Sequence, residues 1–171
     1  MPQNLWELVL EQYPGLAGHE PRIVEGQGPG FAEVYLQGTE DQSPFPDQDV
    51  IELRDKSVGL TPEQKAGIVA GEFISHVLPE RDQAFAAMRN QFMMSMTSGQ
   101  MQREKWAMQR FQQRGIIPED MKFQDYFNRI GLPGLMRGAL TPEFNEEAAE
   151  ALRGENAEVV QTMQNYLRRS R

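Results

Sequence analysis

The spacing of apolar residues along the chain changes near residue 60. Residues 22–25 and 31–36 alternate apolar with polar side chains and are rich in β-favouring types, and residues 50–54 form a third segment of this kind. Beyond residue 60 the apolar residues recur at intervals of three and four, which is typical of amphipathic helices. The pattern therefore predicts a small sheet followed by a helical region.

Proline and glycine mark the turns of the first third. A short helix beginning at Leu5 is expected to end before Tyr13-Pro14-Gly15, because the residue before a proline avoids the helical region. Gly26-Gln27-Gly28-Pro29-Gly30 separates the first two strands and predicts that they pair as a β-hairpin with a long loop. Three strands with one apolar face need a helix to cover that face.

A nearly all-apolar helix is predicted from Pro62 to Leu78. Thr61 and Gln64 are spaced as a capping box at its start, and Pro79 is expected to end it. A helix that is apolar on all sides belongs in the middle of a fold. The later pattern predicts further helices over 80–96, 97–115, 122–130, from Thr141 onward and over 155–169, with a turn-rich segment at 131–138.

These elements predict one domain over residues 1–171, of the α+β class and mainly helical. We expect a small antiparallel sheet of about three strands in the N-terminal third, packed on the central apolar helix, and then a helical C-terminal region. The acidic helix-plus-strand part covers residues 1–60 and the helical part covers 61–171. A chain of 171 residues is long enough to bury a core of its own.

The negative charge of the chain is confined to its first third. Residues 1–60 hold 11 acidic and 3 basic side chains, whereas residues 61–171 hold 14 of each, so the first part carries the whole net charge of −8. Such a surface repels phosphate backbones and disfavours direct binding of nucleic acid. The simplest interpretation is a solvated acidic face. The alternatives are mimicry of DNA or a basic protein partner, contacted by Glu40, Asp41, Asp47 and Asp49.

Composition excludes several kinds of site. The sequence contains no cysteine, which rules out disulfides, thiolate zinc sites and cysteine nucleophiles. The first residues are neither basic nor followed by an apolar core, so no signal peptide is expected. No stretch approaches the roughly 20 apolar residues that span a bilayer. Glycine patterns for nucleotide binding or a nucleophilic serine are missing, and we expect no cofactor, no metal and no membrane span.

Glu72 and His76 are the sharpest candidates for chemistry. They are two of the three polar residues in the apolar run 66–78, and a spacing of four places them on one face of a helix. A buried carboxylate beside a histidine is how acid–base pairs are often built. A buried pair of this kind also commonly has a purely structural role, which is the interpretation we favour.

Methionines concentrate in the helical half of the chain. Methionine fills irregular cores and also adapts to partners at interfaces. Met93 and Met94 fall on adjacent sides of a helix, so they cannot both point inward equally well. A partly adaptable core is the simpler interpretation, and the alternative is a soft helix face for another subunit. The candidate interaction residues are Met93, Met94, Met101 and Met108.

Segments between residues 30 and 167 carry a resemblance to a known group of proteins. They are Gly30–Tyr35, Val50–Leu53, Ile68–Leu78, Asp125–Phe127, Leu135–Ala139 and the C-terminal helix. Together they resemble small phage-encoded virion-associated proteins of the structural or internal-head type, in which one helix is similar to a degenerate zincin core. Glu72 and His76 match that helix, but the zinc triad is missing. The resemblance implies a virion-associated or accessory protein, in the virion or host cytoplasm, rather than an active peptidase.

Three functional hypotheses follow. The leading one is a non-enzymatic phage protein that binds other phage or host proteins, or further copies of itself. The second is a degenerate zincin-like hydrolase or metal-site relic that uses Glu72 and His76. The third is an acidic anti-defence protein that mimics DNA.

Overall fold

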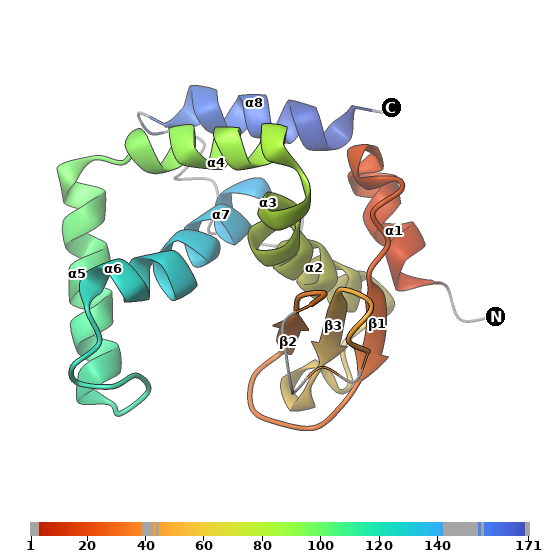
Figure 1. The fold of residues 1–171 in the computed structure, drawn as a ribbon, viewed down its shortest axis with the longest axis horizontal. Coiled ribbons are helices and arrows are strands. Elements are labelled where there is room, and N and C mark those ends of the chain that lie inside the picture. The colour runs from red at the N-terminus through yellow and green to blue at the C-terminus, as the bar shows by residue number, and fades with distance from the viewer. Residues whose placement is uncertain (1–3, 39–42, 44, 142–153, 155, 170–171) are drawn as a thin grey trace.

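The computed structural model describes residues 4–38, 43, 45–141, 154 and 156–169. Figure 1 shows a small sheet at one end of the molecule, beside helices α1 and α2, and helix α5 standing at the opposite end. Helices α4 and α8 run side by side along the top of this view. The α+β, mainly helical class predicted from the sequence is confirmed.

The N-terminal third contains one helix and three strands. Asn4 caps α1 (Leu5–Gln12) by accepting a hydrogen bond from the Trp6 N–H, and the helix ends at Tyr13, before a 3₁₀ turn. The strands are β1 (Arg22–Glu25), β2 (Ala32–Tyr35) and β3 (Val50–Leu53). All four elements coincide closely with the predicted segments.

The predicted hairpin between the first two strands is wrong. The strand order is β1-β3-β2, and β3 pairs parallel with β1 and antiparallel with β2, so the sheet is mixed rather than antiparallel. Three of the four residues of β3 are buried, whereas β1 and β2 have none buried. The central position suits the most apolar strand, because both of its edges are then covered by neighbours.

The central helix was predicted to end at Pro79, but it continues past this residue. Helix α2 (Pro62–Glu72) starts at the expected Thr61 capping box and continues into a π-helical turn, η3 (Phe73–Val77), and then into α3 (Leu78–Arg81). The same sequence of elements recurs further on. Helix α6 (Phe123–Tyr126) leads into a second π-helical turn, η4 (Phe127–Gly131), and then into α7 (Leu132–Leu140). The turn predicted at 131–138 is therefore helical.

Both π-helical turns occur in a Phe-x-x-x-x-Leu-Pro segment, at 73–79 and at 127–133. Proline has no N–H, and its ring collides with the carbonyl of the residue four before it. The chain avoids the collision because the helical turn before each proline is wider than an α-helical turn. The Leu78 N–H donates to the Phe73 carbonyl, and the Leu132 N–H donates to the Phe127 carbonyl, in each case five residues back.

The remaining helices agree with the sequence pattern within a few residues. They are α4 (Gln83–Met94), α5 (Ser98–Gln113) and α8 (Ala157–Arg168). Asp82 caps α4, and Thr97 with Gln100 forms a capping box at the start of α5. The helix start predicted at Thr141-Pro142-Glu143 falls on residues 142–153, which lie outside the described part.

The hydrophobic core surrounds the central helix, as predicted. Phe73 and Ile74 are fully buried, and the Trp6 and Phe73 rings pack edge to face with centroids 5.0 Å apart. Ile51 and Leu53 of β3 join the same cluster. Across the described ranges, no helix combines the length and apolarity needed to cross a membrane.

The close approach of Gly15 to α8 provides a test of this packing. A Cβ at Gly15 would lie 2.6 Å from the backbone oxygens of Tyr166 and Leu167. We expect Gly15→Ala to lower the free energy of unfolding by about 1–3 kcal/mol, the usual effect of overpacking. The control is Gly99→Ala, where the nearest atom outside the helix backbone is 3.8 Å away. Urea unfolding measures both, and equal midpoints for the two variants would contradict the packing described.

Candidate functional site

The structure brings Glu72 and His76 into contact across the first π-helical turn. The Nε2 atom of His76 lies 3.5 Å from a carboxylate oxygen of Glu72. Glu72 ends α2 and His76 lies within η3, so the wide turn separates the two residues along the chain. The pair is mostly enclosed, with 14% of the Glu72 side chain and 33% of the His76 side chain exposed.

Arg137 of α7 completes the cluster. Its guanidinium donates a hydrogen bond of 2.5 Å to the other carboxylate oxygen of Glu72. The arginine stem crosses α2 at Gly71, where a Cβ would lie 2.7 Å from the Arg137 Cγ. Sequence reasoning missed Arg137, which is 65 positions from Glu72.

Burial perturbs both titratable members of the pair. Desolvation raises the pKa of Glu72, and the charge of Arg137 opposes that rise. Desolvation lowers the pKa of His76, and Arg137 lowers it further. A weaker influence on both comes from Glu33 on β2, which favours the protonated state of each. The arrangement therefore favours a neutral imidazole beside a carboxyl group whose burial is partly offset by its pairing with Arg137.

A cleft opens beside this cluster. One hollow of about 460 Å³ is bounded by β2, η4 and α7, and Glu33, Glu72, His76 and Arg137 line it. A second hollow of about 260 Å³ continues from it and shares Val34, His76, Arg129 and Pro133 with the first. His76 is thus the member of the pair that faces both hollows, while Glu72 faces only the larger one.

The chemistry available to the cluster is limited by these contacts. Arg137 and His76 each engage one oxygen of Glu72, which suits a carboxylate that anchors its neighbours better than one that accepts a substrate proton. A catalytic zinc site uses three protein ligands. Among the described residues, no three His, Cys, Asp or Glu side chains gather closely enough to hold a metal ion.

The four candidate methionines occupy different environments. Met93 and Met101 are half-buried and pack against the core, and Met108 is also half-buried. Met94 is 82% exposed. Met93 and Met94 therefore point in different directions, as their adjacent positions on the helix predicted.

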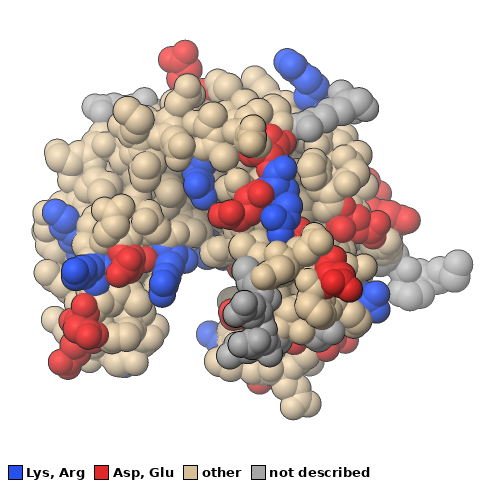
Figure 2. All heavy atoms as spheres, in the orientation of Figure 1, with Lys and Arg blue, Asp and Glu red and all other residues tan. Residues whose placement is uncertain are grey.

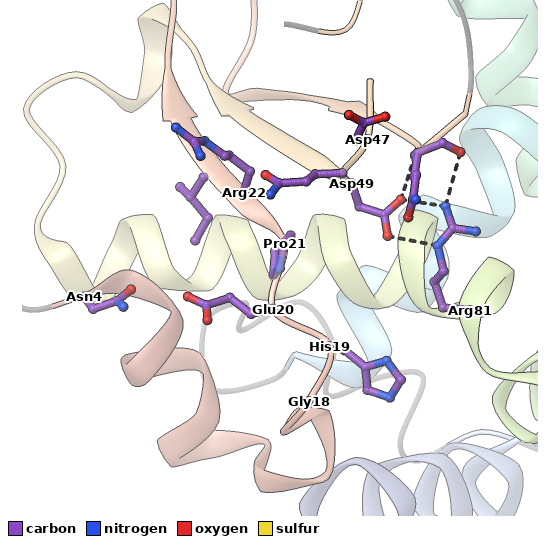
Figure 3. A pocket seen from close by; sticks show the side chains of 12 residues that line it. Asn4, Gly18, His19, Glu20, Pro21, Arg22, Asp47, Asp49 and Arg81 are labelled. Atoms are coloured by element: carbon purple, nitrogen blue, oxygen red, sulfur yellow. Dashed lines mark hydrogen bonds and ion pairs between the residues drawn. The ribbon is translucent and has the colours of Figure 1, made fainter. Parts of the chain in front are cut away.

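The acidic candidates are likewise divided. Glu40 and Asp41 lie outside the described residues. Asp47 is exposed, whereas Asp49 accepts hydrogen bonds of 2.6 and 2.9 Å from Arg81 and one of 2.8 Å from the Gln37 N–H. Figure 3 shows Arg81 and Asp49 facing each other at one side of a polar hollow of about 700 Å³, with Asp47 beyond them. Asp49 thus ties the start of β3 to the end of α3.

Sequence reasoning missed two exposed apolar residues on α5 and just after it. Trp106 on α5 is 55% exposed and Ile116, just after α5, is 61% exposed. The half-buried residues of α5 include Met101, Met108 and Phe111. Their spacing defines the inward side of the helix, and Trp106 lies off that stripe. That periodicity is the signal that would have identified Trp106.

No protein-family model matches the chain, and no curated protein or solved structure matches it significantly. The functional conclusions below therefore depend on the contacts and the chemistry of the chain's own residues.

Replacing Arg137 is expected to raise the pKa of His76. The substitution Arg137→Met removes the positive charge that disfavours the imidazolium and keeps most of the side-chain volume. An NMR titration of the histidine ring protons measures the change, and Arg110→Met on exposed α5 is the matched control. A His76 titration that is unchanged by Arg137→Met would contradict the electrostatic role of Arg137.

His76→Gln is expected to remove a pH dependence of stability. Because the pKa of folded His76 lies below the ordinary 6.5, the unfolded chain binds more protons at this site once the pH falls below 6.5. The contribution of His76 to stability is therefore complete above pH 6.5 and decreases as the pH falls towards the folded-state pKa. Between about pH 7.5 and pH 5.5, urea unfolding should show a larger decrease in the free energy of unfolding for the wild type than for the variant. An equal decrease would show that the pKa of His76 is not lowered in the folded protein.

Proposed function

We propose that this chain is a non-enzymatic, virion-associated or accessory phage protein that acts by binding protein, and that α5 is its binding element. The observation that carries the proposal is that none of the 16 residues of α5 is buried. Helices in proteins are stabilised mainly by packing of an apolar face. A helix with so little burial is suited to gain that packing from a partner.

The inward side of α5 is held by α6 and so fixes the direction of the helix. The Tyr126 hydroxyl donates a hydrogen bond of 3.4 Å to Glu104, and the Tyr126 and Phe111 rings meet edge to face at 6.1 Å. Burial, then Glu104, raises the pKa of Tyr126 to about 12, so the phenol keeps its proton at neutral pH. The outward side is therefore presented in a defined orientation.

Exposed apolar side chains support a binding role for the outward side. Trp106, Met94 and Ile116 are three of the five large apolar residues that the described part leaves exposed, and all three lie on α5 or next to its ends. Tryptophan is enriched among the residues that dominate binding energy at protein interfaces. Figure 1 shows that α5 and α6 extend away from the sheet, and Figure 2 shows a deep notch between these two parts.

Charge complementarity favours a second copy of the chain as the partner. From residue 98 to 114 there are four basic side chains and one acidic side chain. The first sixty residues carry a net charge of −8, and Glu7, Glu20, Asp47 and Asp55 among them are exposed. A basic element that binds an acidic face elsewhere on an identical chain makes a head-to-tail contact, which builds rings or filaments.

Light scattering after size-exclusion chromatography tests this proposal. We expect the wild type to associate with rising concentration at low salt and to dissociate at high salt, because opposite charges attract the copies. Trp106→Ser should weaken the association at least tenfold, as expected for a central aromatic contact. Gln161→Ser is the control, since Gln161 is exposed on α8 and lies outside both α5 and the acidic first third.

Three outcomes would overturn the proposal. One is a wild type that remains monomeric at every concentration and salt. Another is an equal effect of the Gln161 and Trp106 substitutions. The last is an increase in mass that requires added DNA, which would assign α5 to nucleic acid.

A further inference from the structure

We propose that the cleft between β2 and the two π-helical turns binds a small apolar carboxylate, with Arg89 and Arg129 holding the carboxylate group. This inference goes beyond the role of α5, and it stands or fails independently of any self-association. The ligand chemistry has two sources, an acyl chain or the apolar C-terminal residue of a peptide.

Polar and apolar side chains both line the smaller hollow. The polar ones include Arg89 of α4 and Arg129 of η4. The apolar lining residues are Val34, Leu36, Leu132, Pro133 and Met136. Ligand sites of proteins typically combine an apolar lining with a few converging polar groups.

The two arginines have no partner within the described residues. Arg137 is occupied by Glu72, whereas neither Arg89 nor Arg129 makes an ion pair or hydrogen bond in that part of the chain. Arg89 is moreover half-buried, and a charged group that loses water without gaining a partner is destabilising. Planar guanidinium groups match carboxylates through paired, charge-assisted hydrogen bonds.

Both π-helical turns contribute residues to the smaller hollow. Each turn widens one packed helix beside the cleft, and each contributes lining residues, Ser75 and His76 from η3 and Asn128 and Arg129 from η4. Such turns are rare and occur frequently at functional sites. A ligand would therefore contact both widened helices at once.

The size of the hollow limits the ligand. A volume of about 260 Å³ holds about nine non-hydrogen atoms, if each takes roughly the 30 Å³ of a water molecule in the liquid. A six-carbon carboxylate has eight such atoms. For a ligand of this size we expect a dissociation constant on the order of 1 mM.

Three acidic side chains near the cleft affect how well it binds an anion. Glu33 and Glu72 line the larger hollow, and Glu72 is neutralised by Arg137. Glu80 lines the smaller hollow and is exposed, so it opposes an anion there. We therefore expect Glu80→Gln to tighten carboxylate binding about twofold to fivefold.

NMR titrations with hexanoate and with a tetrapeptide that ends in leucine test the proposal on the whole chain. We expect saturable shifts at Val34, His76 and Arg129 with a ligand that carries a free carboxylate. Hexanamide and the C-terminally amidated peptide are the uncharged matches and should bind at least tenfold more weakly. Arg89→Gln and Arg129→Gln should each weaken carboxylate binding about tenfold, and Arg103→Gln on α5 is the matched control.

The outcomes separate the two sources and the alternatives. Binding of hexanoate alone assigns an acyl chain, binding of the peptide alone assigns a peptide terminus, and either supports a carboxylate site. Equal binding of acid and amide would reduce the cleft to an apolar hollow and overturn the proposal. It would also be overturned if no shift saturates, or if Arg129→Gln and Arg103→Gln behave alike.

Discussion

Two Leu-Pro steps inside packed helices are the constraint on which the site depends. A proline cannot donate to the carbonyl four residues before it, yet in both segments the helix continues past the proline through a region with buried Phe and Leu side chains. The chain resolves the conflict by widening one turn before each proline. These turns place His76 and Arg129 at the border of one cleft, so backbone chemistry in two distant segments determines where the polar groups meet.

The ion pair between Glu72 and Arg137 fits the same constraint. A carboxylate that is largely removed from water is destabilising unless it is paired and hydrogen-bonded. Arg137 supplies both, and the absence of a side chain at Gly71 lets its stem reach across α2. Glu72 therefore joins α2 to α7, and its neighbour His76 is held beside a neutralised carboxylate. This arrangement favours anchoring and ligand contact over proton transfer.

The two ends of the molecule serve different purposes in the proposed function. The sheet end packs most of its apolar residues around the central helix and exposes acidic groups, although Phe31 and Val58 are also exposed there. Helix α5 has no buried residue and exposes Trp106. The cleft beside His76 has β2 as one wall, so it borders the sheet end. Light scattering reports assembly and the NMR titrations report ligand binding, so the two are measured separately.

The sequence alone determined the positions of most elements, because capping boxes, apolar periodicity and β-rich alternation act over a few residues. Thr61, Thr97 and the strand at 50–53 are examples, as is the buried central helix. Tertiary structure decided what depends on distant contacts. It placed β3 between strands expected to form a hairpin, because the most apolar strand gains most from two neighbours. It also paired Glu72 with Arg137 and kept Pro79 and Pro133 within helices, because the packed residues around each proline favour a widened turn over a helix end.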